Sequence, residues 1–125
     1  MYFLIPVLLL LHGVAHLVGF VGAFRWVPQI VQQSSVLSGR VSIGEGTSKI
    51  FGVLWLLCAV AFVVAAGGAA VRSGWWQALT FYTAPLSLLL SLTFWPEARL
   101  GVPINLLIIG MMLFSRWSAW PFGVD

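Results

Sequence analysis

Four apolar runs, separated by polar or turn-forming segments, dominate the pattern of hydrophobic and polar positions along this chain. They cover approximately residues 3–24, 47–71, 75–95 and 102–117. A helix rises about 1.5 Å per residue, so about 20 apolar residues reach across a hydrocarbon layer of about 30 Å. The second and third connections are short. The pattern therefore predicts an all-α transmembrane four-helix bundle in up-down-up-down order, with residues 1–125 forming a single domain.

The first connection, residues 27–46, differs from the other two. It is rich in Ser, Gln and Gly and carries Arg40 and Glu45. Apolar residues such as Ile30 and Val41 still recur along it. Long connections of this kind are uncommon in compact chains. We expect one long interfacial loop between the first and second helices, with its apolar side on the membrane surface.

Composition supports the membrane interpretation. The chain of 125 residues is 61% hydrophobic and only 7% charged, whereas soluble domains average about 25% charged residues. Too few charges are present to cover a water-exposed surface. The net charge of +3 comes from bases scattered between apolar runs. Without a basic patch, a nucleic-acid partner is not expected.

Tryptophan and basic residues mark the ends of the predicted helices. Six of the seven tryptophans fall at these ends, where indoles prefer the membrane interface: Trp26, Trp75, Trp76, Trp95, Trp117 and Trp120. The basic residues Arg25, Arg40, Lys49 and Arg99 fall in or next to the first and third connections, against Arg72 and Arg116 on the other side. The positive-inside rule then predicts both termini on the same, outer side.

The first apolar run carries the only two histidines of the chain, His12 and His16. A spacing of four places both imidazoles on one helix face, which Gly19 and Ala23 continue with small residues. Ionisable groups within a membrane face the bundle interior or a cavity. The pair can serve as haem or metal ligands, as a proton relay or as hydrogen-bond partners of a quinone. The alternative is a packing role, with neutral histidines bonded to hydroxyls of the third helix.

Metal and haem binding meet chemical objections. Two histidines four residues apart on one helix cannot hold one haem from both faces, and a zinc site needs at least three protein ligands. No further histidine exists, and no carboxylate lies within a predicted span. We therefore expect no metal site within one chain, unless a partner chain completes one with His12 and His16.

Hydroxyl side chains gather on one face of the third apolar run. At 100° per residue they fall within about 80° of one another: Thr80, Thr83, Ser87 and Ser91. Such a face can line a polar path, or the hydroxyls can bond to carbonyls of their own helix.

Polar residues flank the start of the fourth run. Glu97, Arg99 and Asn105 are candidates to hold a lipid head group or a partner protein at the membrane surface. The alternative is a charged turn followed by a polar residue near a helix N-terminus.

No catalytic signature occurs in the sequence. Nucleophile-elbow, zinc-protease, phosphate-loop and dinucleotide motifs are all absent, and Cys58 is the only cysteine. No catalytic residue is assigned, and a non-enzymatic role is favoured.

The layout resembles that of small bacterial four-helix membrane proteins of the DoxX-like kind. The residues that carry the resemblance are His12, Gly13, His16, Gly19 and Phe20 in the first run, and Glu97, Arg99, Gly101 and Asn105 before and within the fourth. His16 stands where that group usually has a basic residue after the first-helix glycine. The resemblance implies an accessory subunit of a quinone-linked or redox complex in the bacterial plasma membrane.

Three functions follow from these observations. The first is a structural or accessory subunit of a larger membrane complex, with lipids and other membrane subunits or further copies of this chain as partners. The second is a haem- or quinone-binding membrane oxidoreductase in its own right. The third is a small four-helix transporter, in which His12 replaces the membrane-embedded carboxylate that proton-coupled efflux proteins of this size use.

Overall fold

The computed structural model describes residues 3–29, 35–95 and 97–118, with side chains described as far as Phe114. Its elements in chain order are α1 (Leu4–Ala23), β1 (Ser35–Val36), β2 (Val41–Ser42), α2 (Gly44–Ala70), α3 (Trp75–Thr93) and α4 (Gly101–Ser118). The prediction of four helices is confirmed, and each helix bound lies within three residues of the expected position.

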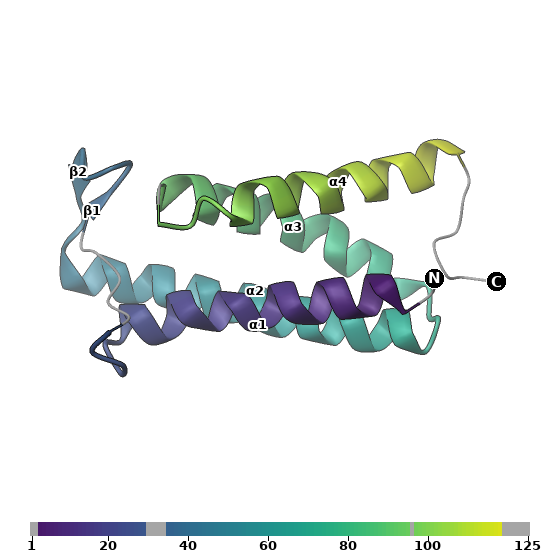
Figure 1. Ribbon diagram of the computed structural model, residues 1–125, viewed down its shortest axis with the longest axis horizontal. Helices are drawn as coiled ribbons and strands as arrows, with labels where there is room; N and C mark the ends of the chain where they lie inside the picture. The colour runs from purple at the N-terminus through teal and green to yellow at the C-terminus, as the bar shows by residue number, and fades with distance from the viewer. Residues whose placement is uncertain (1–2, 30–34, 96, 119–125) are drawn as a thin grey trace.

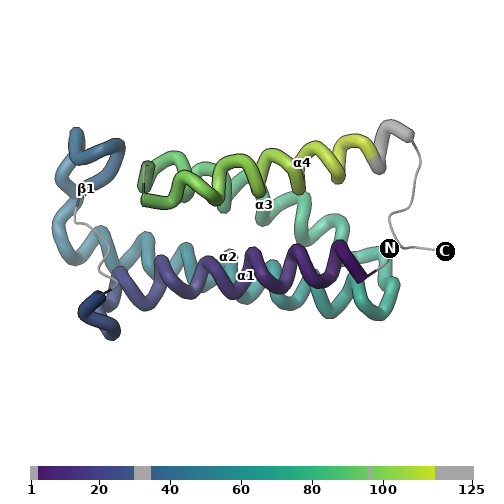
Figure 2. The backbone as a smooth tube through the Cα atoms, viewed as in Figure 1, coloured from purple at the N-terminus to yellow at the C-terminus, as the bar shows by residue number. Residues whose placement is uncertain are grey.

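The helices form two layers (Figures 1 and 2). Each helix packs on the next one along the chain, and the most extensive contact joins α1 to α2. Figure 1 shows α1 and α2 side by side in one layer, with α4 running above α1 and α3 joining the two layers. Two of the described helices, α1 and α2, are long and apolar enough to cross a membrane, and Gly101–Phe114 of α4 is a shorter apolar segment.

The surface of the bundle is apolar and its interior is partly polar. On α1, Leu4, Leu11 and Val18 are 69%, 64% and 53% exposed. The polar side chains that are buried come from all four helices: His12, His16, Ser48, Thr80, Thr83, Ser87, Ser91 and Asn105. These polar side chains are buried alongside a larger set of hydrophobic residues, such as Leu9, Phe62 and Ile108.

The interface between α1 and α2 is built on glycine and alanine. A Cβ atom at Gly13 would lie 3.0 Å from the backbone oxygen of Ala59 and 3.0 Å from Cβ of Phe62. A Cβ atom at Gly52 would collide with Cβ of Ala23. Neither helix leaves room for a side chain here, so the two backbones approach closely, as small residues permit. Ala23, which the helical spacing places on a face of small residues, therefore contributes to this contact.

The first connection contains more structure than the expected surface loop. Residues 35–42 form an antiparallel hairpin that pairs Ser35 with Ser42. Val36 is buried in the core. The backbone N–H of Leu37 donates to the carbonyl of Thr93 at 2.8 Å, and that of Ser38 donates to the carbonyl of Trp95 at 3.1 Å. The hairpin thus covers carbonyls at the end of α3 that have no partner within the helix. The expected loop positions 30–34 lie outside the described residues.

The tryptophans divide into two groups. Trp26, Trp75 and Trp95 lie at helix ends and are 65%, 51% and 44% exposed, as predicted for interfacial anchors. Trp76, which was expected to share that position, is instead buried at 1% exposure. One residue further along a helix turns the side chain by 100°, and this rotation carries Trp76 into the core. Trp117 and Trp120 lie outside the described side chains.

Candidate ligand pocket

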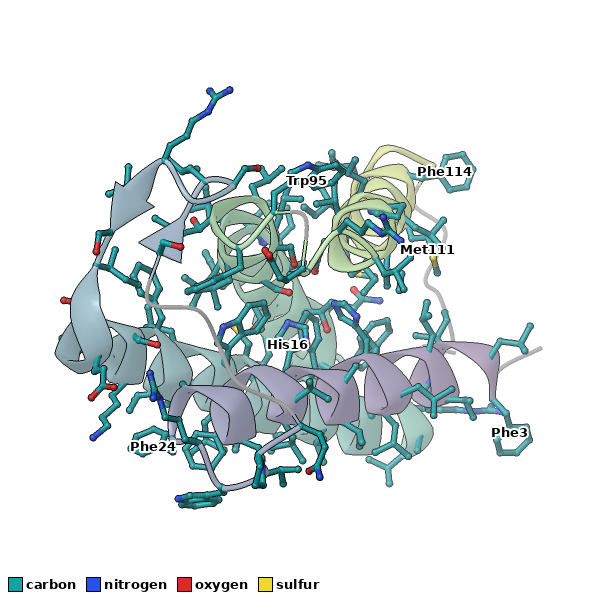
Figure 3. The ribbon with its side chains drawn as sticks, turned by 60° about the vertical axis from the view of Figure 1, so that its left-hand side comes forward. Phe3, His16, Phe24, Trp95, Met111 and Phe114 are labelled. Atoms are coloured by element: carbon teal, nitrogen blue, oxygen red, sulfur yellow. The ribbon has the colours of Figure 1, made fainter. Side chains whose placement is uncertain are left out.

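His16 connects α1 to α3. Its Nδ1 lies 2.7 Å from the carbonyl oxygen of His12, and its Nε2 lies 2.6 Å from Oγ of Ser87. A carbonyl oxygen can only accept, so Nδ1 carries the proton. In the neutral ring, Nε2 then accepts the hydroxyl hydrogen of Ser87. Figure 3 shows His16 in the space between the two layers of helices. The expected contact between the histidines and the hydroxyl face is therefore present at Ser87.

His12 connects α1 to α4. Its Nε2 lies 3.1 Å from Oδ1 of Asn105. The amide nitrogen of Asn105 donates to the carbonyl of Gly101 at 2.8 Å and faces Oγ of Ser91 at 3.5 Å. Asn105 is completely buried. The single side chain of Asn105 thereby joins α1, α3 and α4. Its amide also donates to the carbonyl of Gly101 in the first turn of α4.

Aromatic rings pack around the two imidazoles. The ring of His12 meets that of His16 edge to face with centroids 4.6 Å apart, and Phe62 lies 4.9 Å from His12. Trp55 lies 5.2 Å from His16. A Cβ atom at Gly19 would lie 2.6 Å from the indole of Trp55. Glycine at this position therefore lets the indole rest directly on α1.

A pocket of about 390 Å³ lies beside this network, between α1, α4 and the end of α3. His12, His16, Trp55 and Ser91 contribute to its wall. The remaining lining is mostly apolar and includes Phe94. The volume falls in the range of small-molecule sites, which are commonly about 300–1,000 Å³ and combine an apolar lining with a few polar groups.

The rim of the pocket is exposed. Val18 on α1 and Leu100 before α4 are 53% and 73% exposed, and both line the pocket. Glu97, in the turn between α3 and α4, also lines it and is exposed. The pocket thus opens between α1 and α4, close to a carboxylate.

The polar atoms of the pocket wall offer both donors and an acceptor. The indole N–H of Trp55 is buried and has no hydrogen-bond partner in the described part of the chain. Ser91 carries a hydroxyl, which can donate as well as accept. Nδ1 of His12 has no partner among the described residues either. A ligand with oxygen atoms at its head can bond to the Ser91 hydroxyl without displacing the bonds between helices, and a bond to the buried Trp55 N–H requires the indole to shift toward the pocket.

The four hydroxyl residues predicted to share a face are all buried, but their partners differ. Ser87 and Ser91 belong to the histidine and asparagine network. Thr83 donates to the carbonyl of Leu79 on its own helix at 2.7 Å. Oγ1 of Thr80 has no partner in the described part of the chain. Within the described part of the chain, the polar path considered from sequence is thus connected by hydrogen bonds to other helices only at the two serines.

The three polar residues expected together at the start of α4 are separated. Glu97 and Arg99 are exposed in the turn before α4, whereas Asn105 is turned into the bundle against His12. A head-group site formed by all three residues does not fit this arrangement. Position 105 lies one helical turn after Gly101 on the inner side of α4, which separates it from the charged turn.

The pair of histidines is not joined by further metal ligands. Within the residues that the structure describes, no group of three His, Cys, Asp or Glu side chains lies close enough to hold a metal ion. Both nitrogens of His16 are engaged in hydrogen bonds. Haem ligation by His16 would require one of these bonds to break.

Trp55 and Gly101 are among the pocket residues that were not predicted from sequence to belong to a site. Trp55 was the one tryptophan away from a predicted helix end, and that position was the available signal. Gly101 carries the carbonyl that holds the Asn105 amide. A Cβ atom at position 101 would collide with Oγ of Ser91, so glycine also permits the close approach of α4 to α3.

In comparisons with protein-family models, curated proteins and solved structures, no match to this chain was found. The pocket geometry and the distribution of polar and apolar residues are therefore the basis for an inferred function.

Proposed function

We propose that this chain is an integral membrane protein whose four helices cross the bilayer in alternating directions and whose pocket binds the head of a lipid-soluble quinone. The supporting observation for the membrane is the combination of large exposed hydrophobic side chains on the helices with eight buried polar side chains in the described part of the chain. In lipid, exposed leucine and valine cost nothing, whereas histidine and asparagine side chains must turn inward and find partners. The short connections α2–α3 and α3–α4 are consistent with alternating directions.

A charge on the outer face tests the membrane proposal. Leu11 is 64% exposed and lies near the middle of α1. A lysine at the centre of a membrane helix costs about 3 kcal/mol on insertion scales. Leu11→Lys should reduce the fraction of protein that resists alkaline carbonate extraction from membranes. Thr47→Lys, at the exposed start of α2 beside Lys49, is the matched control and should behave like the parent.

In a soluble protein, both lysines would simply be hydrated. Equal behaviour of Leu11→Lys and Thr47→Lys, with both proteins found in the soluble fraction, would refute the membrane proposal.

The pocket fits a quinone for chemical reasons. A quinone head is a flat apolar ring with two carbonyl oxygens that need donors. Trp55 supplies a buried N–H without a partner, and Ser91 supplies a hydroxyl. The apolar lining accommodates the ring, and the lateral opening past Val18 and Leu100 lets an isoprenoid tail pass into lipid. The donor on Trp55, buried beside an apolar pocket of about 390 Å³, is the observation that carries this assignment.

An accessory role in a larger complex fits the size and surface of the chain. The described residues place nearly all side chains in the four helices, with the short hairpin against the end of α3. The DoxX-like resemblance supports a subunit that serves a quinone-linked redox complex of the bacterial plasma membrane. The charge distribution favours both termini on the outer side.

Quinone binding can be measured on the full chain in phosphatidylcholine nanodiscs. Titration with a short-tailed benzoquinone should quench tryptophan emission to saturation, beyond the quenching that empty discs and free tryptophan explain. Trp55→Phe keeps the ring and removes the N–H, so affinity should fall about tenfold, as for the loss of one well-made hydrogen bond. Trp26→Phe alters an exposed tryptophan at the end of α1 and should retain the parent affinity.

Unsaturable quenching in the parent, or equal affinity in Trp55→Phe and the parent, would contradict this site. Solubilisation in mild detergent tests the accessory role separately. The tagged chain should co-purify with larger subunits in a fixed ratio, and migration as a monomer at every detergent concentration would oppose that role. An absorption spectrum of the same sample tests the haem alternative, because bound haem gives a Soret band.

A further inference from the structure

The amide of Asn105 determines which nitrogen of His12 carries the proton. Its nitrogen donates to the carbonyl of Gly101 at 2.8 Å, so its oxygen is the atom that faces His12. An amide oxygen only accepts, so Nε2 of His12 must carry the hydrogen. In the neutral imidazole the other nitrogen, Nδ1, then has a lone pair and no hydrogen.

Nδ1 of His12 is an acceptor without a partner among the described residues. The side chain is 5% exposed, and it lines the pocket. Nδ1 does not belong to the fully buried polar atoms that lack a partner, which are Trp55 Nε1, Trp76 Nε1 and Thr80 Oγ1 among the described residues. Two neighbouring donors are already in use: Nδ1 of His16 donates to the His12 carbonyl, and the amide nitrogen of Asn105 donates to the Gly101 carbonyl.

We infer that the pocket prefers a head group that carries a hydroxyl donor, and hence binds the reduced quinol more tightly than the quinone. This inference rests on the proposed function and narrows its ligand. Each oxygen of a quinol accepts from Trp55 or Ser91 as a quinone carbonyl does. A quinol oxygen also donates, and Nδ1 of His12 is the acceptor that the pocket wall provides for it. A quinone carbonyl has no hydrogen and leaves this nitrogen unpaired.

The preference has a consequence for redox equilibrium. A ligand shifts an equilibrium by its difference in affinity for the two states. Tighter binding of the quinol therefore raises the reduction potential of the bound couple. A tenfold preference corresponds to about 30 mV for a two-electron couple. The pocket would then retain quinol and release quinone, as suits the delivery of reduced quinone to a neighbouring subunit.

The test compares three ligands on the full chain in phosphatidylcholine nanodiscs: a short-tailed benzoquinone, its quinol, and the quinol with both hydroxyls methylated. Bound ligand is separated with the discs and quantified by chromatography, with empty discs as the partition control. The quinol should bind roughly three- to tenfold more tightly than the quinone, the range expected for one net hydrogen bond. The methylated quinol keeps the ring and the oxygens but lacks the donors, and it should lose that advantage.

His12→Gln is the matched variant. Glutamine retains an N–H donor for Asn105 but has no ring nitrogen at the Nδ1 position, so the quinol and its methyl ether should bind with similar affinity. Leu11→Ala, on the exposed side of the same helix, should keep the parent preference. Trp55→Phe should weaken quinol and quinone by similar factors, because both accept from the indole.

The outcomes separate the two proposals. Equal or tighter binding of the quinone by the parent, or a quinol preference that persists in His12→Gln, overturns this inference while the quinone site stands. If neither form binds above the level of empty discs, the proposed function fails and this inference fails with it.

Discussion

Helix α1 makes two different kinds of contact with its neighbours. Toward α2 it presents glycine and alanine: Gly13 lies against the backbone of Ala59, and Ala23 lies against Gly52. Its imidazole rings also pack on Trp55 and Phe62 of α2, but their ring nitrogens reach Ser87 of α3 and Asn105 of α4 through hydrogen bonds of 2.6 Å and 3.1 Å.

The difference explains why the pocket lies where it does. Two helices that meet through glycine bring their backbones into contact and leave no space between them. A histidine that reaches across to a serine acts as a spacer, because the ring itself occupies the distance between the helices. Lipid supplies no hydrophobic force between helices, so close packing and hydrogen bonds must hold them together. The glycine and alanine contact therefore holds α1 against α2, and the hydrogen-bonded contacts of α1 with α3 and α4 leave room for a pocket.

The largest effect is expected from adding a side chain within the glycine and alanine contact between α1 and α2. Gly52→Leu would place a side chain on Cβ of Ala23, with no flexible neighbour to give way. Overpacking of this kind costs about 3 kcal/mol, so thermal unfolding in detergent should shift to a clearly lower temperature. Gly67→Ala on the same helix is the control, because nothing lies within 4 Å of its added Cβ. It should be neutral or stabilise the helix by up to about 1 kcal/mol.

A smaller loss of stability is expected from removing the hydrogen bonds that join α1 to α4. Asn105→Ala removes the partner of His12 and of the Gly101 carbonyl and leaves the N–H of His12 buried. The free energy of unfolding should fall by about 2 kcal/mol, the cost of an unsatisfied buried polar group. Leu106→Ala, at the next and exposed position of α4, should change it by no more than about 0.5 kcal/mol. An equal loss in both variants would mean that the network does not hold α4 in place.

The bond between His16 and Ser87 should appear as a coupling in a double-mutant cycle. Hydrogen bonds between membrane helices average about 0.6 kcal/mol and reach about 1.7 kcal/mol, so a coupling within this range is expected between His16→Ala and Ser87→Ala. Thr83 bonds to its own helix instead. The cycle of His16→Ala with Thr83→Ala should therefore give a coupling near zero, and similar values in both cycles would contradict the geometry.

The smallest effect is expected from the ion pair at the end of the contact between α1 and α2. Arg25 and Glu45 form an ion pair at 2.9 Å between the end of α1 and the start of α2, with side chains 51% and 66% exposed. Exposed pairs are worth no more than about 1 kcal/mol and are screened by salt. Arg25→Gln should lower the unfolding temperature slightly at low salt and not at high salt. Arg40→Gln, an exposed arginine in the hairpin, should show a smaller salt-dependent change.

Much of the helical layout was predictable because local signals mark it. Apolar runs of helical length predicted the four helices, while Arg25, Trp75 and Trp95 marked helix ends. The periodicity of α1 predicted that His12 and His16 share one face, and that face is buried. The burial of Trp76 was not predicted, because Trp75 and Trp76 are adjacent tryptophans at the same predicted helix end. They differ only in the direction in which each side chain points from the helix axis.

The sequence by itself determined that this chain forms four apolar helices and that the polar side of the first helix is a special surface. Tertiary structure alone decided that His16 meets Ser87 and that His12 meets Asn105, residues 93 positions apart. It also decided that the hairpin folds back onto α3. Partners so distant are selected by the rotation and register of packed helices, and these depend on how glycine, alanine and indole surfaces fit together. No local pattern of polar and apolar residues encodes that fit.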